Sequence, residues 1–555
     1  MHKIGELTAG LVLRVALALA CALAVHASRA PQSPAEQPKE DKCSIEGRVT
    51  NAVTGEALRR VALSLTGPGR VTAETDEAGR FAFQGLNPGS YSLTADRAAY
   101  ARQTYGARGS STTGTPLVLV AGQQMKDILF KLAPAALISG RVLDEDGEPP
   151  PTNTVAMAFQ SSYQRGVRQW LPVGEAMVND LGEFRIPSLA AGNYLVAAIN
   201  AQSVVSTGTS AQQPGDKPER EYVLTFFPSA TDAANATPIQ VTAGAEAAGT
   251  VVRLQKVNTV RIRGKVAGAG EGKMAMMRLS PKGVTSPALA LLQGKMVVVQ
   301  QKDGSFEIKG VAPGSYMLSG MLMDTQARTQ LSASLLLQVG DRHIDGLVLQ
   351  PAAAPELAGS VVVADKAAAK LSSVQVALEA KEYLGLSAPS ATAGDDGKFT
   401  LKDVLPNKYW MQARNLPEGA YVKSMRYGDQ EVSDDSIDLS GGVAGTLQVT
   451  LSMAGAQVDG VVQGADDKPV SGATVVLVPD SRRYSLFKEA RTGDNGSYSF
   501  KGVPPGDYKI LAWADIESGA YQDPDFLKRY ESKAEKLSLK ESDRKTLSLK
   551  AIPAE

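Results

Sequence analysis

Short runs in which apolar and polar residues alternate occur throughout this chain, and such alternation predicts β-strands that bury one face. The clearest runs follow a repeated signature in which an aromatic residue precedes a tyrosine by ten positions. The five pairs are Phe81 with Tyr91, Phe184 with Tyr194, Phe306 with Tyr316, Phe399 with Tyr409, and Tyr498 with Tyr508. A catalytic motif would normally occur once, so the fivefold repetition predicts a structural unit copied along the chain.

Turns and an opening strand accompany each signature. An acidic residue followed closely by Gly, as in Asp494 to Gly496, precedes the aromatic residue, and a turn of the Pro-Gly type precedes the tyrosine. Because Asp accepts local backbone hydrogen bonds and Gly adopts positive φ without steric cost, we interpret the acidic turns as β-hairpin turns. A Gly-x-Val strand opens every unit, at Gly47, Gly140, Gly264, Gly359 and Gly460.

Two further strands close each unit, which makes about seven short strands per roughly one hundred residues, as in a β-sandwich. The predicted fold class is all-β, a tandem array of about five seven-stranded, immunoglobulin-like sandwiches. The expected ranges are 43–134, 135–256, 257–351, 352–453 and 454–555. The second is expected to carry an inserted loop at 201–220, and the fifth a short helical excursion at 523–536. The short linker of residues 351–355 favours an elongated rod, with side-by-side packing of neighbouring repeats as the alternative.

Residues 1–30 have the features of a secretory signal peptide. Lys3 lies near the start, an apolar run follows over residues 15–25, and cleavage is expected after Ala27 or Ala30. The apolar run is too short to span a bilayer as a permanent helix. We therefore expect an exported protein without an integral membrane segment, located in the periplasm, at the outer membrane or outside the cell.

The two cysteines, the leader and the charge balance refine this expectation. Cys21 raises the alternative of a lipoprotein, although Leu19 stands where a small residue is usual, and residues 31–42 are expected to form a flexible leader. After cleavage only Cys43 remains, which excludes an intrachain disulfide and predicts a small buried apolar residue. Because 58 basic and 58 acidic residues balance, the composition does not indicate a nucleic-acid partner.

The succession of a Gly-x-Val strand, an Asp-x-x-Gly-x-Phe turn and a Pro-Gly-x-Tyr turn resembles the carboxypeptidase regulatory-like domain, a transthyretin-like sandwich. This fold is similar to the starch-binding-like fold of carbohydrate-binding modules and to the B-repeats of Gram-positive adhesins. The resemblance covers residues 43–555, and the layout resembles exported multi-repeat bacterial proteins. It implies an accessory module of a peptidase, receptor or surface protein, because such folds carry many functions.

The resemblance also suggests metal sites and an isopeptide crosslink, but the residues of this chain argue against them. A zinc carboxypeptidase site needs two His and a Glu, whereas His343 is the only histidine after residue 30. His343 is better interpreted as a surface residue of a polar turn. The acidic turns at residues 144–146 and 395–396 are better interpreted as turns than as calcium sites. No isopeptide crosslink is expected, because no acid lies just after the signature tyrosines. We expect no catalytic residue, cofactor or metal.

The three tryptophans, Trp170, Trp410 and Trp513, are the candidate carbohydrate contacts, because sugar rings stack on exposed aromatic faces. The strand alternation places Trp410 and Trp513 on the faces opposite to the core. Adjoining segments could instead cover them, and residues 521–530 are a ready cover for Trp513.

These observations predict an exported, non-catalytic binding or scaffold protein whose partner is a protein or a polysaccharide at the cell envelope. One alternative is a carbohydrate-binding protein of the envelope or extracellular space. A second alternative is an accessory component of a system that degrades peptides or glycans.

Overall fold

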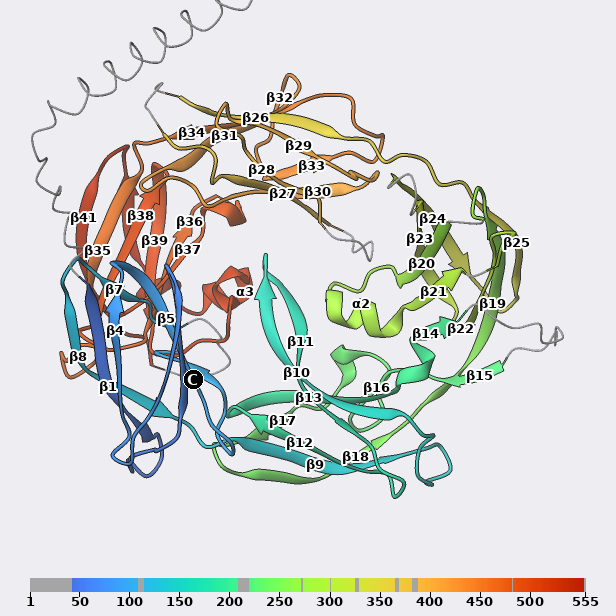
Figure 1. The fold of residues 1–555 in the computed structure, drawn as a ribbon, viewed down its shortest axis with the longest axis horizontal. Coiled ribbons are helices and arrows are strands. Elements are labelled where there is room, and N and C mark those ends of the chain that lie inside the picture. Colours follow the sequence, from blue (N-terminus) through green and yellow to red (C-terminus); the bar gives the residue numbers. More distant parts are fainter. Residues whose placement is uncertain are drawn as a thin grey trace, which may run out of the picture.

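The structure, a computed structural model, describes residues 42–107, 114–207, 219–270, 273–299, 301–324, 329–364, 369–381, 388–481 and 483–553. The predicted signal peptide, its cleavage positions and Cys21 lie outside these residues. The described part forms five pairs of sheets (Figure 1). Each pair encloses its own cluster of buried apolar side chains, which confirms the predicted tandem array of β-sandwiches.

The first two sandwiches are built as follows. In the first, one sheet contains β1 (Cys43–Asn51), β4 (Arg80–Leu86) and β8 (Gln124–Leu132), and the other contains β2 (Ala62–Thr66), β3 (Arg70–Glu74), β5 (Gly89–Asp96), β6 (Gln103–Thr104) and β7 (Leu117–Leu119). In the second, one sheet contains β9 (Ala136–Leu143), β12 (Glu183–Leu189) and β18 (Glu246–Arg253), and the other contains β10 (Thr154–Gln164), β11 (Val167–Met177), β13 (Gly192–Asn200), β16 (Thr225–Phe226) and β17 (Ile239–Val241). Two 3-10 helices, η1 (Ala201–Ser203) and η2 (Ala233–Asn235), follow β13 and β16.

The third and fourth sandwiches add short strands to the same plan. In the third, one sheet contains β15 (Glu219–Tyr222), β19 (Lys256–Val266), β22 (Ser305–Val311) and β25 (Ile344–Leu349), and the other contains β14 (Val205–Thr207), β20 (Lys273–Pro281), β21 (Lys295–Val299), β23 (Gly314–Asp324) and β24 (Thr329–Val339). In the fourth, one sheet contains β26 (Leu357–Val363), β29 (Lys398–Leu401), β31 (Tyr421–Tyr427), β32 (Gln430–Glu431) and β34 (Leu447–Ser452), and the other contains β27 (Gln375–Ala380), β28 (Ser390–Thr392), β30 (Lys408–Arg414) and β33 (Ser436–Asp438).

The fifth sandwich and the helices complete the described elements. One sheet of the fifth sandwich contains β35 (Ala456–Gln463), β38 (Ser497–Val503) and β41 (Arg544–Lys550), and the other contains β36 (Thr474–Pro479), β37 (Lys488–Arg491), β39 (Gly506–Trp513) and β40 (Glu535–Leu539). The helices are α2 (Pro287–Gln293), η3 (Tyr484–Leu486), η4 (Ala520–Gln522), α3 (Pro524–Lys528) and η5 (Glu531–Lys533). None of the helices in the described ranges has the length and apolar character needed to cross a bilayer.

The two strands of each signature belong to opposite sheets. In the first sandwich β4 pairs with β1, whereas β5 pairs with β2, so Phe81 and Tyr91 enter one core from both sides. The acidic turn before β4 also joins opposite sheets, so its interpretation as a β-hairpin turn was wrong. The local chemistry is as predicted, because Asp76 Oδ1 accepts from the Arg80 N–H at 2.8 Å. Such a turn can connect two strands of one sheet or two strands of different sheets. Here the pairing of β4 with β1 places β4 in the other sheet.

The signature tyrosine has the same role in all five sandwiches. Its ring lies in the core, and its hydroxyl donates a hydrogen bond to the carbonyl oxygen four residues earlier, across the turn between the sheets. The distances are 2.9 Å for Tyr91, 2.7 Å for Tyr194, 2.9 Å for Tyr316, 2.7 Å for Tyr409 and 3.0 Å for Tyr508. The repeated tyrosine is therefore explained by a buried hydroxyl that ties the two sheets together.

We expect Tyr409→Phe to destabilise the fourth sandwich by about 1–1.5 kcal/mol, because the buried carbonyl of Leu405 loses its donor while the packing of the ring is kept. Hydrogen exchange of β27 and β30, followed by mass spectrometry, measures this change. Unaltered protection of both strands would contradict the role given to the hydroxyl.

The opening glycine is required because two neighbours approach its Cα closely. A Cβ at Gly359 would lie 2.3 Å from the Phe399 ring and 2.7 Å from the Leu447 carbonyl oxygen. At Gly140 it would lie 1.8 Å from the carbonyl oxygen of Thr250. The Gly-x-Val motif therefore allows the parallel partner strand, and in most units the signature ring, to pack against the opening strand.

The interval expected as a loop inserted in the second sandwich contributes strands to the third. β14 pairs in parallel with β21, where Val205 lies opposite Met296, and β15 pairs antiparallel with β19, where Glu219 lies opposite Thr259. Residues 208–218 of this interval lie outside the described ranges. The second and third sandwiches are thus joined by β-pairing as well as by the chain between them.

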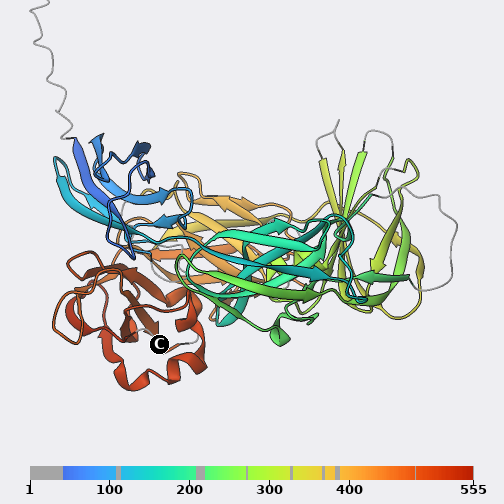
Figure 2. The same ribbon diagram turned by 90° about the horizontal axis from the view of Figure 1, so that it is seen from below.

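The five sandwiches form a closed circuit rather than the expected elongated rod (Figure 1). The first and the fifth contact each other, with Thr115 Oγ1 donating to the Thr492 carbonyl oxygen at 3.2 Å and Tyr105 donating to Asp494. Figure 2 shows these two sandwiches at the same end of the molecule. Short linkers restrict the motion of neighbouring sandwiches but do not fix their relative orientation. Contacts between sandwiches that are distant in the sequence determine that orientation.

Candidate functional site

The hairpin of β10 and β11 reaches from the second sandwich into the middle of the circuit (Figure 1). Gln164 pairs with Val167, so Arg165 and Gly166 form a two-residue turn, with φ values of 51° and 72°. Positive φ at both positions suits the right-handed twist of a hairpin. A Cβ on Gly166 would lie 2.7 Å from the Tyr484 hydroxyl oxygen, so glycine allows the tip to touch the fifth sandwich.

Arg165, at the tip, joins three sandwiches. Its Nη2 forms an ion pair with Glu379 of the fourth sandwich at 2.8 Å, and its guanidinium carbon lies 4.9 Å from the centre of the Trp410 ring. Its backbone N–H donates to the side chain of Gln522 in the fifth sandwich. The Arg165 side chain is only 13% exposed, so it is partly shielded from the solvent that weakens surface ion pairs.

Glu379 and Trp410 lie opposite each other on β27 and β30, on the face that points away from the core of the fourth sandwich. The Glu379 carboxylate accepts from Gln164 Nε2 at 2.8 Å and from Gln412 Nε2 at 2.9 Å, in addition to Arg165. Arg165 balances the charge of the carboxylate, and the two amides help to hold it in one position. Strand alternation produces this arrangement, because the neighbours of Trp410 on β30 face the core.

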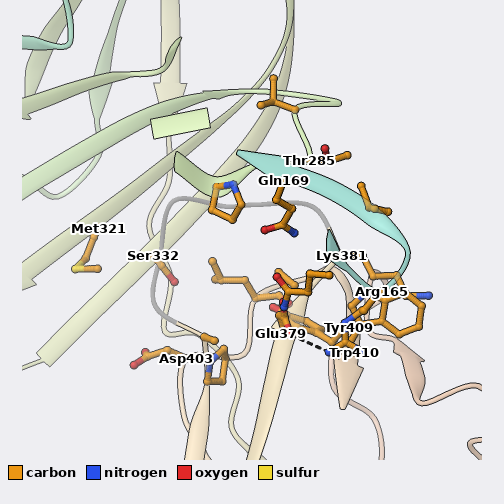
Figure 3. A pocket seen from close by; sticks show the side chains of 18 of the residues that line it. Arg165, Gln169, Thr285, Met321, Ser332, Glu379, Lys381, Asp403, Tyr409 and Trp410 are labelled. Atoms are coloured by element: carbon orange, nitrogen blue, oxygen red, sulfur yellow. Dashed lines mark hydrogen bonds and ion pairs between the residues drawn. The ribbon is translucent and has the colours of Figure 1, made fainter. Parts of the chain in front are cut away.

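A cleft of about 680 Å³ lies beside this junction and is bounded by three sandwiches. Figure 3 shows Gln169 of β11, Ser332 of β24, and Glu379 and Trp410 of the fourth sandwich around one space. Lys381 also lines it, with its ammonium 3.7 Å from the centre of the Trp410 ring. This central cleft thus combines an indole, amides and a lysine in one concave site, which is typical of small-ligand sites.

Of the two alternatives left open for Trp513, the structure shows the covered one. Its side chain is 1% exposed and offers no face to a sugar. Phe526 and Tyr530 cover it, with ring centres 6.1 Å and 5.6 Å from that of Trp513. The covering segment predicted as the alternative is therefore what occupies this face.

Trp170 is half-buried on β11 and does not line the central cleft. Its carbonyl oxygen accepts from Ser286 Oγ at 2.8 Å, next to α2 of the third sandwich. Its ring packs against a cluster shared by the second and third sandwiches, which includes Phe159 and Leu289. The structure thus brings Trp410 alone of the three tryptophans into the cleft.

The remaining candidates have structural roles in the described ranges. His343 is half-buried, and its Nδ1 accepts from the Arg261 N–H at 3.2 Å. Asp144 Oδ1 closes its turn by accepting from the N–H groups of Asp146 and Glu148, both at 2.9 Å. Glu145 forms ion pairs with Arg220 and Lys256.

Reasoning from the sequence missed Arg165, Glu379 and Lys381. The turn formed by Arg165 and Gly166 between two strand-like runs could have identified a hairpin tip. Nothing in the sequence indicates that this tip reaches residues more than two hundred positions away, such as Glu379.

A comparison with known families supports this architecture. The carboxypeptidase regulatory-like domain matches residues 44–132 and 457–522, which cover β1 to β8 of the first sandwich and β35 to η4 of the fifth. The first and the fifth sandwiches are thus the parts of the chain that match a carboxypeptidase regulatory-like domain. The three sandwiches between the matched ranges have the same strand arrangement as the two matched ones, with the opening strand placed between the aromatic strand of the signature and a parallel partner.

Among curated proteins none matches this sequence. Solved structures with local similarity include the Bacillus anthracis TIE protein, with 11% identity over 75% of this chain and 74% of that chain and a TM-score of 0.15. A streptococcal ancillary pilin has 12% identity over 56% of this chain and 99% of its own, with a TM-score of 0.19. The minor pilin GBS52 of Streptococcus agalactiae has 12% identity over 39% and 97%, with a TM-score of 0.21. These TM-scores are too low to bear on function.

Proposed function

We propose that this chain is an exported, non-catalytic binding and scaffold protein whose central cleft binds a carbohydrate. The observation that carries the proposal is the half-buried indole of Trp410 on a concave surface built by three sandwiches. The cleft depends on how the second, third and fourth sandwiches pack together, because each of them supplies one of its walls. The same packing of sandwiches therefore provides both the scaffold and the proposed binding site.

The side chains around Trp410 suit a ligand with both apolar and hydroxyl-bearing faces. A sugar ring presents C–H groups that pack on an indole, and hydroxyl groups that exchange hydrogen bonds with amides. Gln169 extends into the cleft, and Gln164 and Lys381 line it (Figure 3). Such a site needs few polar groups, because each fixes the orientation of the ligand while aromatic area supplies affinity.

We expect the wild-type protein to bind at least one polysaccharide or oligosaccharide of a glycan array, and Trp410→Ala to weaken that binding by about tenfold or more, roughly 1.4 kcal/mol. The reason is that the variant removes the aromatic surface of the cleft. Titration calorimetry with the ligand found on the array measures the change in affinity.

Trp170→Ala is the matched control, because it removes another half-buried indole, one outside the cleft, and should leave the affinity unchanged. Small-angle scattering of both variants checks that the circuit stays closed. An array without any bound glycan, or equal affinities of Trp410→Ala and wild type, would remove the carbohydrate proposal.

A further inference from the structure

A second cavity, of about 320 Å³, lies on the other side of the Arg165 tip, between the fourth and the fifth sandwiches. Its walls come from the hairpin tip, from the end of β30, from η3 and the start of β37, and from η4. The residues that matter for the argument are Arg165, Arg414, Tyr484, Ser485, Lys488 and Gln522.

The lining of this cavity contains three cationic side chains and neither aspartate nor glutamate. Arg165 is neutralised by Glu379 outside the lining. Arg414 directs its Nε to Gln412 Oε1 at 2.9 Å, a neutral acceptor. Within the described ranges neither the exposed Arg414 nor the half-buried Lys488 forms an ion pair, so two cationic residues line the cavity without a counter-charge.

The carboxylates nearby are engaged elsewhere. Asp435 accepts from both Arg483 and Ser485. Glu489, next to Lys488, accepts from the Tyr521 hydroxyl at 2.8 Å. Lys488 lies on an edge strand of its sheet and lines the cavity. Neither of these two carboxylates pairs with it.

Lys488 is half-buried, and its side chain makes no hydrogen bond to any residue that the structure describes. Burial lowers the pKa of Lys488 below its usual value, because removing the charged form from water costs free energy. A partly buried cation of this kind is costly unless it is paired. An anionic ligand would supply the missing partner and offset that cost.

We propose that this second cavity is an oxyanion site, in which Lys488 and Arg414 bind the carboxylate, sulfate or phosphoryl group of a small ligand. Tyr484, Ser485 and Gln522 line the same cavity, and their hydroxyl and amide groups are of the kind that donates to such oxygens. Since the lining belongs to the second, fourth and fifth sandwiches, the bound anion stabilises their contact. This proposal does not rest on carbohydrate binding, although Gln164 and Arg165 line both cavities.

Thermal unfolding of the full chain tests the proposal with three probes, inorganic phosphate, sulfate and glucuronate, each against sodium chloride at equal ionic strength. We expect at least one probe to raise the melting temperature in a concentration-dependent manner, because a ligand that binds only the folded state stabilises it. The three arms distinguish a phosphoryl, a sulfate and a carboxylate ligand.

Lys488→Met keeps the length of the side chain and removes its charge. We expect this variant to weaken the probe at least tenfold and, without any anion, to be no less stable than wild type, because it no longer desolvates a lone charge. Lys545→Met is the control, since Lys545 is an exposed lysine of the same sandwich, and it should respond to the probe as wild type does.

Three results would overturn the proposal. They are an effect of every probe no larger than that of sodium chloride, a full response of Lys488→Met, and a loss of stability in anion-free Lys488→Met. The last would show that the ammonium already has a structural role. Trp410→Ala should keep the anion response, so failure of the carbohydrate proposal and failure of this one are distinguishable.

Discussion

Replacing Trp513 by alanine is expected to destabilise the fifth sandwich by about 3–5 kcal/mol, the largest effect anticipated for a single side chain. Trp513 is 1% exposed and packs with Leu511, Phe526 and Tyr530 in a cluster on the outer face of β39. Hydrogen exchange of β36 and β39 measures the change, with protection expected to fall roughly a hundredfold or more.

The indole N–H of Trp513 has no hydrogen-bond partner among the described residues, so the stabilisation comes from packing. Trp513→Phe should therefore cost less than Trp513→Ala, because it keeps part of the ring volume. Trp170→Ala should leave the exchange of β36 and β39 unchanged. Equal exchange in wild type and Trp513→Ala would show that the covering segment of α3 and its flanks does not stabilise the fifth sandwich.

Replacing Asp435 by alanine is expected to weaken the contact between the fourth and the fifth sandwiches by about 3 kcal/mol. Asp435 is 1% exposed and accepts from Arg483 Nε at 3.1 Å, from Arg483 Nη2 at 2.9 Å and from the Ser485 N–H at 3.2 Å. Its removal leaves a largely buried guanidinium without a counter-charge. An increased radius of gyration in small-angle scattering would report the opened contact.

A double-mutant cycle separates this ion pair from other effects of the Asp435 substitution. Arg483→Ala alone should cost a similar amount, and the double variant should cost less than the sum of the two single changes. Asp435→Asn controls for the backbone, because Asn tolerates the φ of 61° at this position while the charge is removed. Strictly additive effects would contradict a direct coupling.

The two proposed binding sites lie on either side of the same junction. Arg165 and Gln164 line both cavities, so the hairpin tip separates them while it closes the circuit. Because Asp435→Ala and Trp513→Ala change the fourth and fifth sandwiches themselves, neither variant can report on ligand contacts alone. Trp410→Ala and Lys488→Met alter one cavity each, which is why they carry the tests of binding.

Much of the fold could be predicted because its determinants are local. The alternation around Phe399 and Leu401 predicted a strand with one buried face, and both residues are buried. The wrong interpretation of the acidic turns as β-hairpin turns has an equally local cause, since the hydrogen bonds of Asp76 are the same for both connections. Only the partner strand, far away along the chain, distinguishes them.

The candidate site was much less predictable. Trp410 could be placed on the outer face of its strand by counting residues, and so could Trp513, yet one lines a cleft and the other is covered. The difference depends on which segments pack over each face. For Trp513 that segment follows directly in the sequence, whereas for Trp410 the neighbour is Arg165 from another sandwich.

By itself, the sequence determined the strands, the repeated tyrosine and glycine positions and the number of sandwiches, because periodicity and turn chemistry act over a few residues. Only the tertiary structure decided the closed circuit, the transfer of β14 and β15 to the third sandwich, and the two cavities at the Arg165 tip. Arg165 and Glu379 meet across 214 positions, and neither side chain carries a local sign of the other. Such contacts depend on how whole sandwiches pack, and a pattern of a few residues in the sequence does not predict this packing.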